Sequence, residues 1–422
     1  MLAAVLGLAG PAYAADPPAA PRSPAAADEV PGWNAFVERL RALGPEMLAR
    51  LPESWRADPQ VRQEVGRLML EALGARALEA VGGDGDHPQF MPAIGLTLNI
   101  SQPNSDTIYR RATVTPGGVY RLSGRRGSVR IAKIGEYVRG SEQGIAGGVV
   151  IAGYHDLNAL HVDGKGRFEV VLSAERPAGW TGDWWKLDPR TTSLGIRQVA
   201  SDWAHDRDPE ISIERLDIPA QRPRPSAADL RARLDALGPT TANAALNFVA
   251  HVAELRQQGY VNKLHVFDVA ALGAALEGQF YYEGGYELRD DEALIVEAKV
   301  PARCLYYSTI LTNEIYETTD WYNNESSLND SQSRVDKDGV LRIVVSAKDP
   351  GVPNWLDTAG YPIGAIQGRW TGCSEQPVPS VRKVALADVR SQLPPDTPTV
   401  TPAQRDRIVR DRRALLQQRP LW

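Results

Sequence analysis

Two short stretches of this chain concentrate the residue types that bind ligands or move protons. The first, residues 102–111, reads Gln-Pro-Asn-Ser-Asp-Thr-Ile-Tyr-Arg-Arg, and the second, residues 349–358, reads Asp-Pro-Gly-Val-Pro-Asn-Trp-Leu-Asp-Thr. Each combines carboxylate, amide and aromatic side chains with turn-forming residues, which is typical of binding loops between strands. We therefore expect the two stretches to form neighbouring walls of one cavity.

In the first stretch, Asp106 and Tyr109 are three residues apart. A carboxylate near a phenol can act as a general acid and base where burial shifts the two pKa values. Both residues are therefore candidate catalytic groups, and Asn104 beside them is a candidate ligand contact. The structural alternative is that Asn104 and Asp106 bind backbone amides in a turn. The sequence leaves both interpretations open.

In the second stretch, Asn354 and Asp357 flank Trp355. An aromatic surface beside amide and carboxylate groups suits sugar hydroxyls or a polycyclic ligand, because the ring stacks while the polar groups orient the ligand. Downstream, Arg369 is expected to pair with Asp357 or with an anionic group of a substrate. The alternative is a structural corner, in which Trp355 fills the core and Asn354 satisfies loop carbonyls.

These residues support three hypotheses about function. The first is a cofactor-independent enzyme, a hydrolase, lyase or isomerase, that acts on a glycan or an apolar small molecule. The second is a non-catalytic carbohydrate- or lipid-binding β-sandwich protein that uses the same loops, and the third is a structural envelope protein. The candidate catalytic residues are Asp106, Tyr109, Asp357 and Arg369, and the candidate ligand contacts are Asn104, Asp349, Asn354, Trp355 and Tyr322.

Part of the chain resembles a known family. The second stretch, followed by Gly368-Arg369-Trp370 and preceded by Trp321-Tyr322-Asn323-Asn324, is similar to bacterial and fungal proteins with the domain of unknown function numbered 1214. Residues 103–109 resemble the Asn-x-Asp-Thr-x-Tyr element of a related domain, numbered 1254, on its N-terminal side. The resemblance covers most of residues 90–390. It implies β-rich, sandwich-like domains and supplies no reaction, cofactor or catalytic residue.

Hydrophobic periodicity predicts an α+β fold. Two β-sandwich-like, jelly-roll-like antiparallel domains are expected, with helical N-terminal, linking and C-terminal segments. Gly44-Pro45 is expected to end the first helix, and a second linking helix is expected over 241–258. No internal repeat is strong enough to claim, although the two β segments could be distant relatives. The expected divisions are a helical region over 33–83, a first β-rich domain over 88–220, a helical linking region over 226–278, a second β-rich domain, the 1214-like one, over 280–392, and a C-terminal helix over 401–419.

The first residues predict export. Residues 1–10 are apolar and lead into Ala12-Tyr13-Ala14, a small-x-small pattern that signal peptidase accepts. We expect a cleaved signal peptide over 1–14, a flexible leader over 15–32, and a periplasmic or secreted mature protein. The positively charged segment that normally opens a signal peptide is missing, and a disordered cytosolic N-terminus is the alternative. No later stretch could span a bilayer, so the mature chain is expected to be soluble.

Cysteine content is low, with Cys304 and Cys373 alone. An exported protein can form disulfides, and closing this loop would contribute roughly 4 kcal/mol in the chain-entropy model. Two separately buried thiols fit the sequence equally well. Both remain open, and the pair is a disulfide candidate.

Composition argues against several partners. The net charge of −5 does not favour nucleic acid, because proteins that bind it usually carry a basic excess. The chain has no Gly-x-Ser-x-Gly elbow, which disfavours an α/β-hydrolase triad. Its cysteines lack metal-binding spacing, and the His and Asp residues near 155–161 and 202–208 match no metal motif. We therefore expect no metal and no cofactor, and a small molecule or glycan as the ligand.

Overall fold

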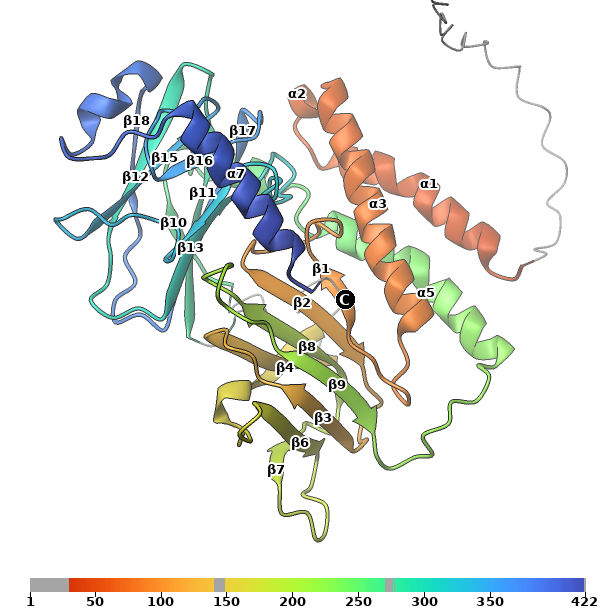
Figure 1. Cartoon of the computed structure of the whole chain (residues 1–422). Helices are drawn as coiled ribbons and strands as arrows, with labels where there is room; N and C mark the ends of the chain where they lie inside the picture. Colours follow the sequence, from red (N-terminus) through yellow and green to blue (C-terminus); the bar gives the residue numbers. More distant parts are fainter. Residues whose placement is uncertain (1–29, 140–148, 270–275, 277, 421–422) are drawn as a thin grey trace, which may run out of the picture.

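A computed structural model describes residues 30–139, 149–269, 276 and 278–420 of the chain. The expected signal peptide and residues 15–29 of the expected leader lie outside the described residues. Figure 1 shows two β-rich bodies, one built from the orange-to-green part of the chain and one from the teal-to-blue part, with a layer of helices beside them. The α+β class with two sheet-rich domains is therefore confirmed.

The first sandwich, residues 91–215, packs the sheet β1-β2-β8-β4-β5 against the sheet β7-β6-β3-β9. Apolar residues at alternate positions of both sheets meet in one core, to which Leu122, Val170 and Ile196 contribute. The strands are β1 (Met91–Ile94), β2 (Thr107–Thr113), β3 (Tyr120–Arg125), β4 (Ile131–Arg139), β5 (Val149–Asp156), β6 (Arg167–Ser173), β7 (Asp183–Lys186), β8 (Thr191–Val199) and β9 (Glu210–Arg215), with a short 3-10 helix at Leu157–Ala159.

The second sandwich, residues 265–385, packs the sheet β10-β11-β17-β13-β14 against the sheet β16-β15-β12-β18. Its core includes Tyr286, Val296 and Trp370, all buried. The strands are β10 (His265–Phe267), β11 (Gln279–Glu287), β12 (Glu292–Lys299), β13 (Tyr306–Leu311), β14 (Ser327–Asn329), β15 (Val340–Ser346), β16 (Trp355–Asp357), β17 (Ile363–Thr371) and β18 (Ser380–Ala385), followed by the 3-10 helix Leu386–Gln392.

The second sandwich repeats the topology of the first. Each strand from β1 to β9 has a counterpart nine strands later, with the same neighbours in the same order. Local contacts repeat as well. The Trp184 indole donates to the Ser173 hydroxyl at 2.9 Å, and the Trp355 indole donates to the Ser346 hydroxyl at 3.0 Å, each between a parallel strand pair. The repeat that the sequence could not establish is therefore present in the fold.

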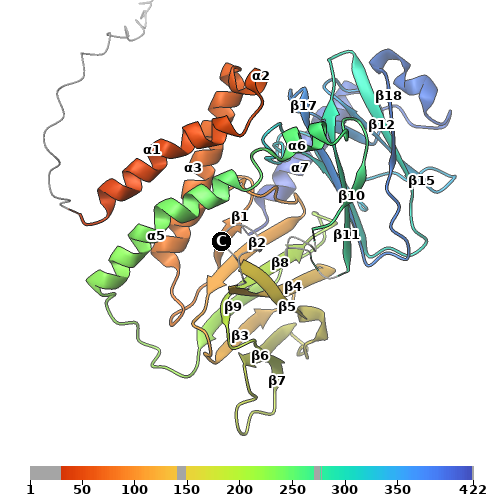
Figure 2. The same cartoon turned by 180° about the vertical axis from the view of Figure 1, so that it is seen from behind.

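Three long helices form a layer that covers one side of the molecule (Figure 2). Helices α1 (Trp33–Ala49), α3 (Pro59–Gly82) and α5 (Ala227–Leu246) share an apolar core. The short helices α2 (Glu53–Arg56) and α6 (His251–Gln257) contribute to the same core. Two expected boundaries are wrong, because Pro45 lies inside α1, and residue 241, where a second linking helix was expected to begin, lies inside α5. Burial of Leu43 and Met47 around Pro45 offsets the backbone hydrogen bond that proline removes. No helix among the described residues is long and apolar enough to cross a membrane.

The linking region is not helical throughout. Residues 265–267 form β10, which pairs with β11 at the edge of the second sandwich. Residues 270–275 and 277 lie outside the described part of the chain. The second linking helix is also shorter than expected, since α5 continues to Leu246 and α6 begins only at His251.

Helix α7 (Pro402–Gln417) crosses from one sandwich to the other (Figure 1). The spacing of Thr401 and Gln404 predicts a capping box at its start, and the two residues are bonded reciprocally. Arg405 binds Asp349 of the second sandwich at 3.0 Å. Past the end of the helix, Arg419 binds Asp208 of the first sandwich at 2.9 Å. The C-terminal segment therefore holds the two sandwiches against each other.

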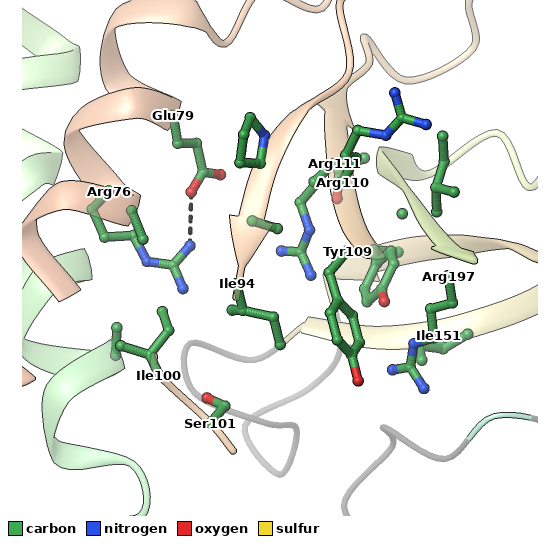
Figure 3. Close-up of a pocket in the computed structure, with 18 of the residues that line it drawn as sticks. Arg76, Glu79, Ile94, Ile100, Ser101, Tyr109, Arg110, Arg111, Ile151 and Arg197 are labelled. Carbon is green, nitrogen blue, oxygen red and sulfur yellow. Dashed lines mark hydrogen bonds and ion pairs between the residues drawn. The ribbon is translucent and has the colours of Figure 1, made fainter. Parts of the chain in front are cut away.

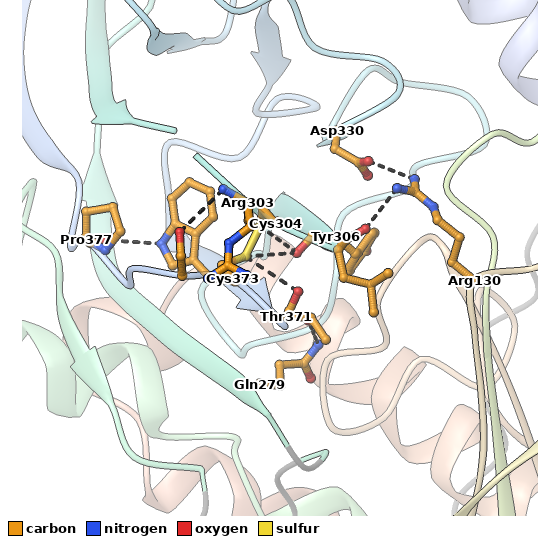
Figure 4. The surroundings of a disulfide bond; sticks show 12 residues. Arg130, Gln279, Arg303, Cys304, Tyr306, Asp330, Thr371, Cys373 and Pro377 are labelled. Atoms are coloured by element: carbon orange, nitrogen blue, oxygen red, sulfur yellow. Dashed lines mark hydrogen bonds and ion pairs between the residues drawn. A yellow bond between two sulfur atoms is a disulfide. The ribbon is translucent and has the colours of Figure 1, made fainter. Parts of the chain in front are cut away.

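Cys304 and Cys373 form a disulfide (Figure 4). The bond lies just beyond the paired strands β13 and β17, where Tyr306 faces Thr371. Between the disulfide and the first sandwich, Arg130 donates to the Leu305 carbonyl at 2.8 Å and to Asp330 at 2.7 Å. The disulfide thus lies at the end of the second sandwich that faces the first.

Candidate functional site

A cavity of about 620 Å³ lies where helices α3 and α5 meet the two sandwiches. Figure 3 shows Arg76 and Glu79 of α3 on one side and Tyr109 and Arg197 of the first sandwich on the other. The second sandwich adds residues of β11 and β17, and α5 closes the space between them. The cavity is therefore a junction of three parts of the fold. Its polar lining includes Arg76, Glu79, Gln102, Tyr109, Arg111, Tyr137, Arg139, Arg197, Tyr281, Tyr316, Gln367 and Arg369.

Strand alternation decides which side chains enter the cavity. On β2, Tyr109 and Arg111 share one face, and Arg110 between them turns away to bond Gln198 and the Pro209 carbonyl. On β8, Arg197 lies opposite Tyr109 in the pairing register. A guanidinium and a phenol from neighbouring strands therefore stand side by side on the cavity wall.

The second sandwich supplies the same pair from the equivalent strands. Arg369 on β17 lies opposite Tyr281 on β11, as Arg197 on β8 lies opposite Tyr109 on β2. The Arg369 guanidinium lies 5.2 Å from the centre of the Tyr281 ring. Both arginines also interact electrostatically with both tyrosines, so the two pairs converge. The duplicated fold thus places two arginine–tyrosine pairs in one cavity.

Charge in the cavity is unbalanced towards positive. Among the described residues that line it are six arginines, of which Arg110 directs its guanidinium away to Gln198, and one carboxylate, Glu79. Glu79 is already paired with Arg76 at 2.7 Å. Burial lowers the pKa of Arg369, but the phenols of Tyr281 and Tyr109 more than compensate and hold it above its usual value. Arg369 is 4% exposed and remains a cation at any physiological pH.

Buried hydrogen-bonding atoms of the lining point to an acceptor-rich ligand. In the described part of the chain, Nε2 of Gln102, Nε of Arg76 and Nε of Arg369 have no hydrogen-bond partner. All three atoms are donors. A buried donor without a partner costs free energy, so such atoms call for an explanation. A ligand with several acceptor oxygens would satisfy them.

A series of side-chain hydrogen bonds orients Arg369. Arg369 donates to Oε1 of Gln367 at 2.7 Å, and Gln367 donates to the Tyr316 hydroxyl at 2.8 Å. The Tyr316 hydroxyl in turn donates to Glu283 at 2.7 Å, and Glu283 lies 2.7 Å from Nε2 of His251. Because each member is fixed by the next, the guanidinium is held in one orientation before any ligand enters.

Backbone strain also gathers at this cavity. Among the described residues, five positions other than glycine have a positive φ, and three of them, Ser101, Gln102 and Tyr316, line the cavity. Their φ values are 56°, 54° and 68°. Such conformations cost about 1–3 kcal/mol each and cluster at binding and catalytic sites. The strain therefore agrees with the charge in marking this cavity as the candidate site.

The first stretch reaches the cavity with Tyr109 but not with Asp106. The Asp106 carboxylate is 1% exposed and accepts bonds from Trp203 at 2.9 Å, Tyr306 at 2.6 Å and Asn329 at 2.9 Å. Burial raises its pKa, and these donors only partly oppose the shift. With three donors on a sealed carboxylate, Asp106 joins the two sandwiches and does not face a ligand.

Asn104 belongs to the same interdomain contact. Its amide donates to the Tyr306 hydroxyl at 2.8 Å and to Thr107 at 3.0 Å, and its backbone N–H donates to the Tyr109 hydroxyl at 3.2 Å. The expected ligand contact is therefore a structural one. Its value to the site is indirect, because it holds Tyr109 in place.

Among the candidate residues of the second stretch and Arg369 downstream of it, only Arg369 lines the cavity. The Asn354 amide is fully used by the backbone of Arg334 and Arg342. The Trp355 indole is buried against Ser346, and Asp357 accepts the Ala359 N–H at 2.8 Å in a tight turn. The structural-corner interpretation describes these residues, as the equivalent contact of Trp184 in the first sandwich also indicates.

The remaining candidate contacts are also structural. Asp349 accepts the Gly351 N–H at 2.8 Å and binds Arg405. Tyr322 is half-buried and donates to the Leu416 carbonyl at 3.4 Å. The expectation that the two stretches wall one cavity is therefore wrong for residues 349–358, because their polar groups are used within their own corner and against α7.

The sequence interpretation missed Arg197 and Tyr137, and it included Arg111 in the first stretch without assigning it a role. The signal for Arg197 was faint, since it is a single charged residue at an alternating position of the strand Ser193-Leu194-Gly195-Ile196-Arg197. Alternation predicts a shared face but not which face is buried.

Among the described residues, no group of three or more His, Cys, Asp or Glu side chains could hold a metal ion.

Comparison with known proteins supports the fold and names no activity. No protein-family model matches the chain, and no curated protein matches it. An uncharacterized protein from Burkholderia cenocepacia aligns with a TM-score of 0.77 at 29% identity, over 85% of this chain and 98% of that one. The VPA0106 protein from Vibrio parahaemolyticus aligns with a TM-score of 0.43 at 14% identity, over 76% and 98% of the two chains. The Burkholderia protein therefore shares the fold.

Proposed function

We propose that this protein binds a small organic acid with an apolar body in the cavity between its helices and its two sandwiches. The observation that carries the proposal is the positive, donor-rich lining, with Arg197 and Arg369 converging from equivalent strands. A carboxylate matches the planar fork of arginine and accepts up to four hydrogen bonds. It would neutralise buried charge and satisfy buried donors together.

Apolar residues argue for the rest of the ligand. Ile94, Ile100, Ile151, Phe248 and Phe267 line the same cavity beside the arginines. A cavity of about 620 Å³ falls within the usual size range of small-molecule sites, about 300–1,000 Å³. The apolar-small-molecule hypothesis drawn from the sequence is thus kept, with an anionic group added. A neutral glycan would leave the excess of arginine unexplained.

A binding experiment on the full chain tests this proposal. Benzoate, phenylacetate and phenyl phosphate are compared with benzamide by thermal shift and calorimetry. Anions should raise Tm in proportion to occupancy, and benzamide should not. Arg369→Met should weaken binding about tenfold to a hundredfold, because a charge-assisted hydrogen bond in a buried site is lost. An equal response to benzamide and benzoate would overturn the proposal, and the phosphate ester separates carboxylate from general anion recognition.

Arg121→Met provides the matched control. Arg121 lies on β3 and pairs with Glu214 on the outer sheet of the first sandwich, and it does not line the cavity. The same substitution there should leave anion binding unchanged. A loss of binding in both variants would indicate a nonspecific response to reduced positive charge.

We also propose that the protein is exported. The disulfide between Cys304 and Cys373 supports this, because such bonds persist mainly in oxidising compartments. Fractionation of cells that express the full gene, with mass spectrometry of the mature N-terminus, tests the location. Recovery of a reduced, unprocessed chain from the cytosol would contradict it.

A further inference from the structure

One phenol in the cavity is placed differently from the others. Tyr137 on β4 lies opposite Ser193 on β8, and its ring extends over Gly195. A Cβ atom added at Gly195 would lie 2.6 Å from Cε2 of Tyr137 and 3.1 Å from its hydroxyl oxygen. The ring therefore lies over Gly195, and its hydroxyl interacts with Arg197, two residues further on. Glycine at position 195 makes this placement possible.

Two guanidinium groups flank this ring. The Arg111 guanidinium lies 4.3 Å from the ring centre, and Arg197 also interacts with the phenol. Burial alone would raise the pKa of Tyr137, but Arg197 and Arg111 overcome that effect and hold it below the usual value. Tyr281 in the same cavity behaves in the opposite way, because burial keeps its pKa raised. The anionic form of Tyr137 is thus favoured relative to that of Tyr281.

Tyr137 has no tyrosine counterpart in the second sandwich. The arginine–tyrosine pairs occur in both sandwiches, at equivalent strand positions. The position equivalent to Tyr137 in the second sandwich is Thr312, which pairs with Ala365 just beyond β13. Binding an anion between the sandwiches therefore needs only the repeated pairs. The extra phenol between two cations requires a separate explanation.

We propose that Tyr137 is a catalytic acid–base that removes a proton from the carbon next to the carboxylate of the bound organic acid. This inference rests on the proposed function, since Arg197 and Arg369 must hold the carboxylate. A carboxylate held by the Arg197 guanidinium lies on the side toward which the Tyr137 hydroxyl points. In this proposal, the carbon adjacent to the carboxylate lies within reach of that oxygen.

The step balances without a co-reactant. The phenolate oxygen of Tyr137 forms an O–H bond as the C–H bond breaks. The C–H electron pair moves into the bond to the carboxyl carbon and gives an ene-diolate, whose added negative charge faces the guanidinium groups. Return of the proton from Tyr137 regenerates the acid and the phenolate. The reaction class is therefore a reversible proton transfer, read out as hydrogen exchange, epimerisation or isomerisation.

Deuterium exchange tests this inference on the full chain. The protein is incubated in D₂O with mandelate, phenylacetate or 3-phenylpropionate, and NMR follows the α-proton of each acid. The Tm shift that each acid causes is measured in parallel. An acid that binds should exchange faster with the protein than in buffer, with a rate that rises with pH as a phenol ionises. Tyr137→Phe should reduce the rate by about 10²–10⁴-fold. Its affinity for the acid, obtained from the Tm shift, should stay within threefold of the wild-type affinity.

The outcomes separate the two proposals. Tyr322→Phe, which removes a half-buried phenol outside the cavity, should exchange like the wild type. Acids that bind the wild type without exchange, or exchange equally fast with Tyr137→Phe, would overturn the catalytic inference and leave the binding proposal standing. Failure of all organic acids to shift Tm would overturn the binding proposal and this inference with it.

Discussion

Asp106 fastens the two sandwiches to each other. It belongs to the first sandwich, and two of the three donors on its carboxylate, Tyr306 and Asn329, belong to the second. Its backbone carbonyl also accepts a bond from Arg419 at 2.8 Å. At the scale of the residue, the carboxylate stabilises the interface on which the cavity depends.

Asp106→Ala should therefore lower the free energy of unfolding by roughly 3 kcal/mol, because it leaves several buried donors without an acceptor. Urea unfolding measures the change. Asp290→Ala removes an exposed carboxylate of the same sandwich pair and should change stability little. An unaltered unfolding midpoint for Asp106→Ala would contradict the interface role.

Gly195 carries a second prediction at this scale. In Gly195→Ala, the new methyl group would overlap the Tyr137 ring, at 2.6 Å from Cε2. A side chain can rotate away more easily than a backbone can shift, so the fold should survive while Tyr137 leaves its place between the arginines. We expect exchange activity to fall about tenfold or more, which is the same direction of change as in Tyr137→Phe. The loss of Tm should be small. Full activity in Gly195→Ala would contradict the placement.

At the scale of the element, the disulfide secures the end of strands β13 and β17. These strands are already paired, so the bond acts mainly by restricting the unfolded chain over a separation of 69 residues. Replacing both cysteines by serine should lower the free energy of unfolding by about 2–4 kcal/mol. Unfolding of the double variant beside the oxidised wild type measures it, and identical midpoints would contradict the prediction.

Helix α3 and the loop 312–319 form a second element-scale contact, rich in carboxylates around Arg67. Burial raises the pKa of Glu314 to about 7 from 4.5, and Glu64 and Glu317 nearby add to the shift. The folded protein therefore keeps a proton that the unfolded chain releases above pH 4.5. Stability from this group is present at low pH and is lost as the pH rises through 7.

Glu314→Gln should remove that loss. Relative to the wild type, the variant should gain on the order of 1–3 kcal/mol between pH 5 and pH 8. Urea unfolding at the two pH values gives the comparison. A constant difference between the two proteins at both pH values would show that Glu314 does not titrate as inferred.

Elements were easier to predict from the sequence than the site. The caps at Asp58, Ser226 and Thr401 act through residues within three positions, so local spacing identifies them. The apolar run of residues 340–346 predicts a strand, and β15 has the same bounds. The site depends instead on cross-strand register, which brings Tyr109 beside Arg197 from 88 residues away, and on how two sandwiches dock. No local pattern carries that information.

At the scale of the whole molecule, the cavity is a product of duplication. Two sandwiches with the same strand order present equivalent strands to each other, and each contributes an arginine beside a tyrosine. Asp106 and α7 hold the halves together, and the helices α3 and α5 close the space. Asymmetry enters with single residues, above all Tyr137. The proposed binding therefore uses residues of the shared frame, and the proposed proton transfer uses a residue found in one half.

A crystal structure grown with para-bromobenzoate tests the central claim most directly. The account predicts a carboxylate within hydrogen-bonding distance of Arg369 and Arg197, and an anomalous bromine signal among Ile94, Ile100 and Phe248. The Arg369→Met protein in the same condition should show no such density. A ligand bound outside this cavity, or a carboxylate turned away from both arginines, would contradict the account.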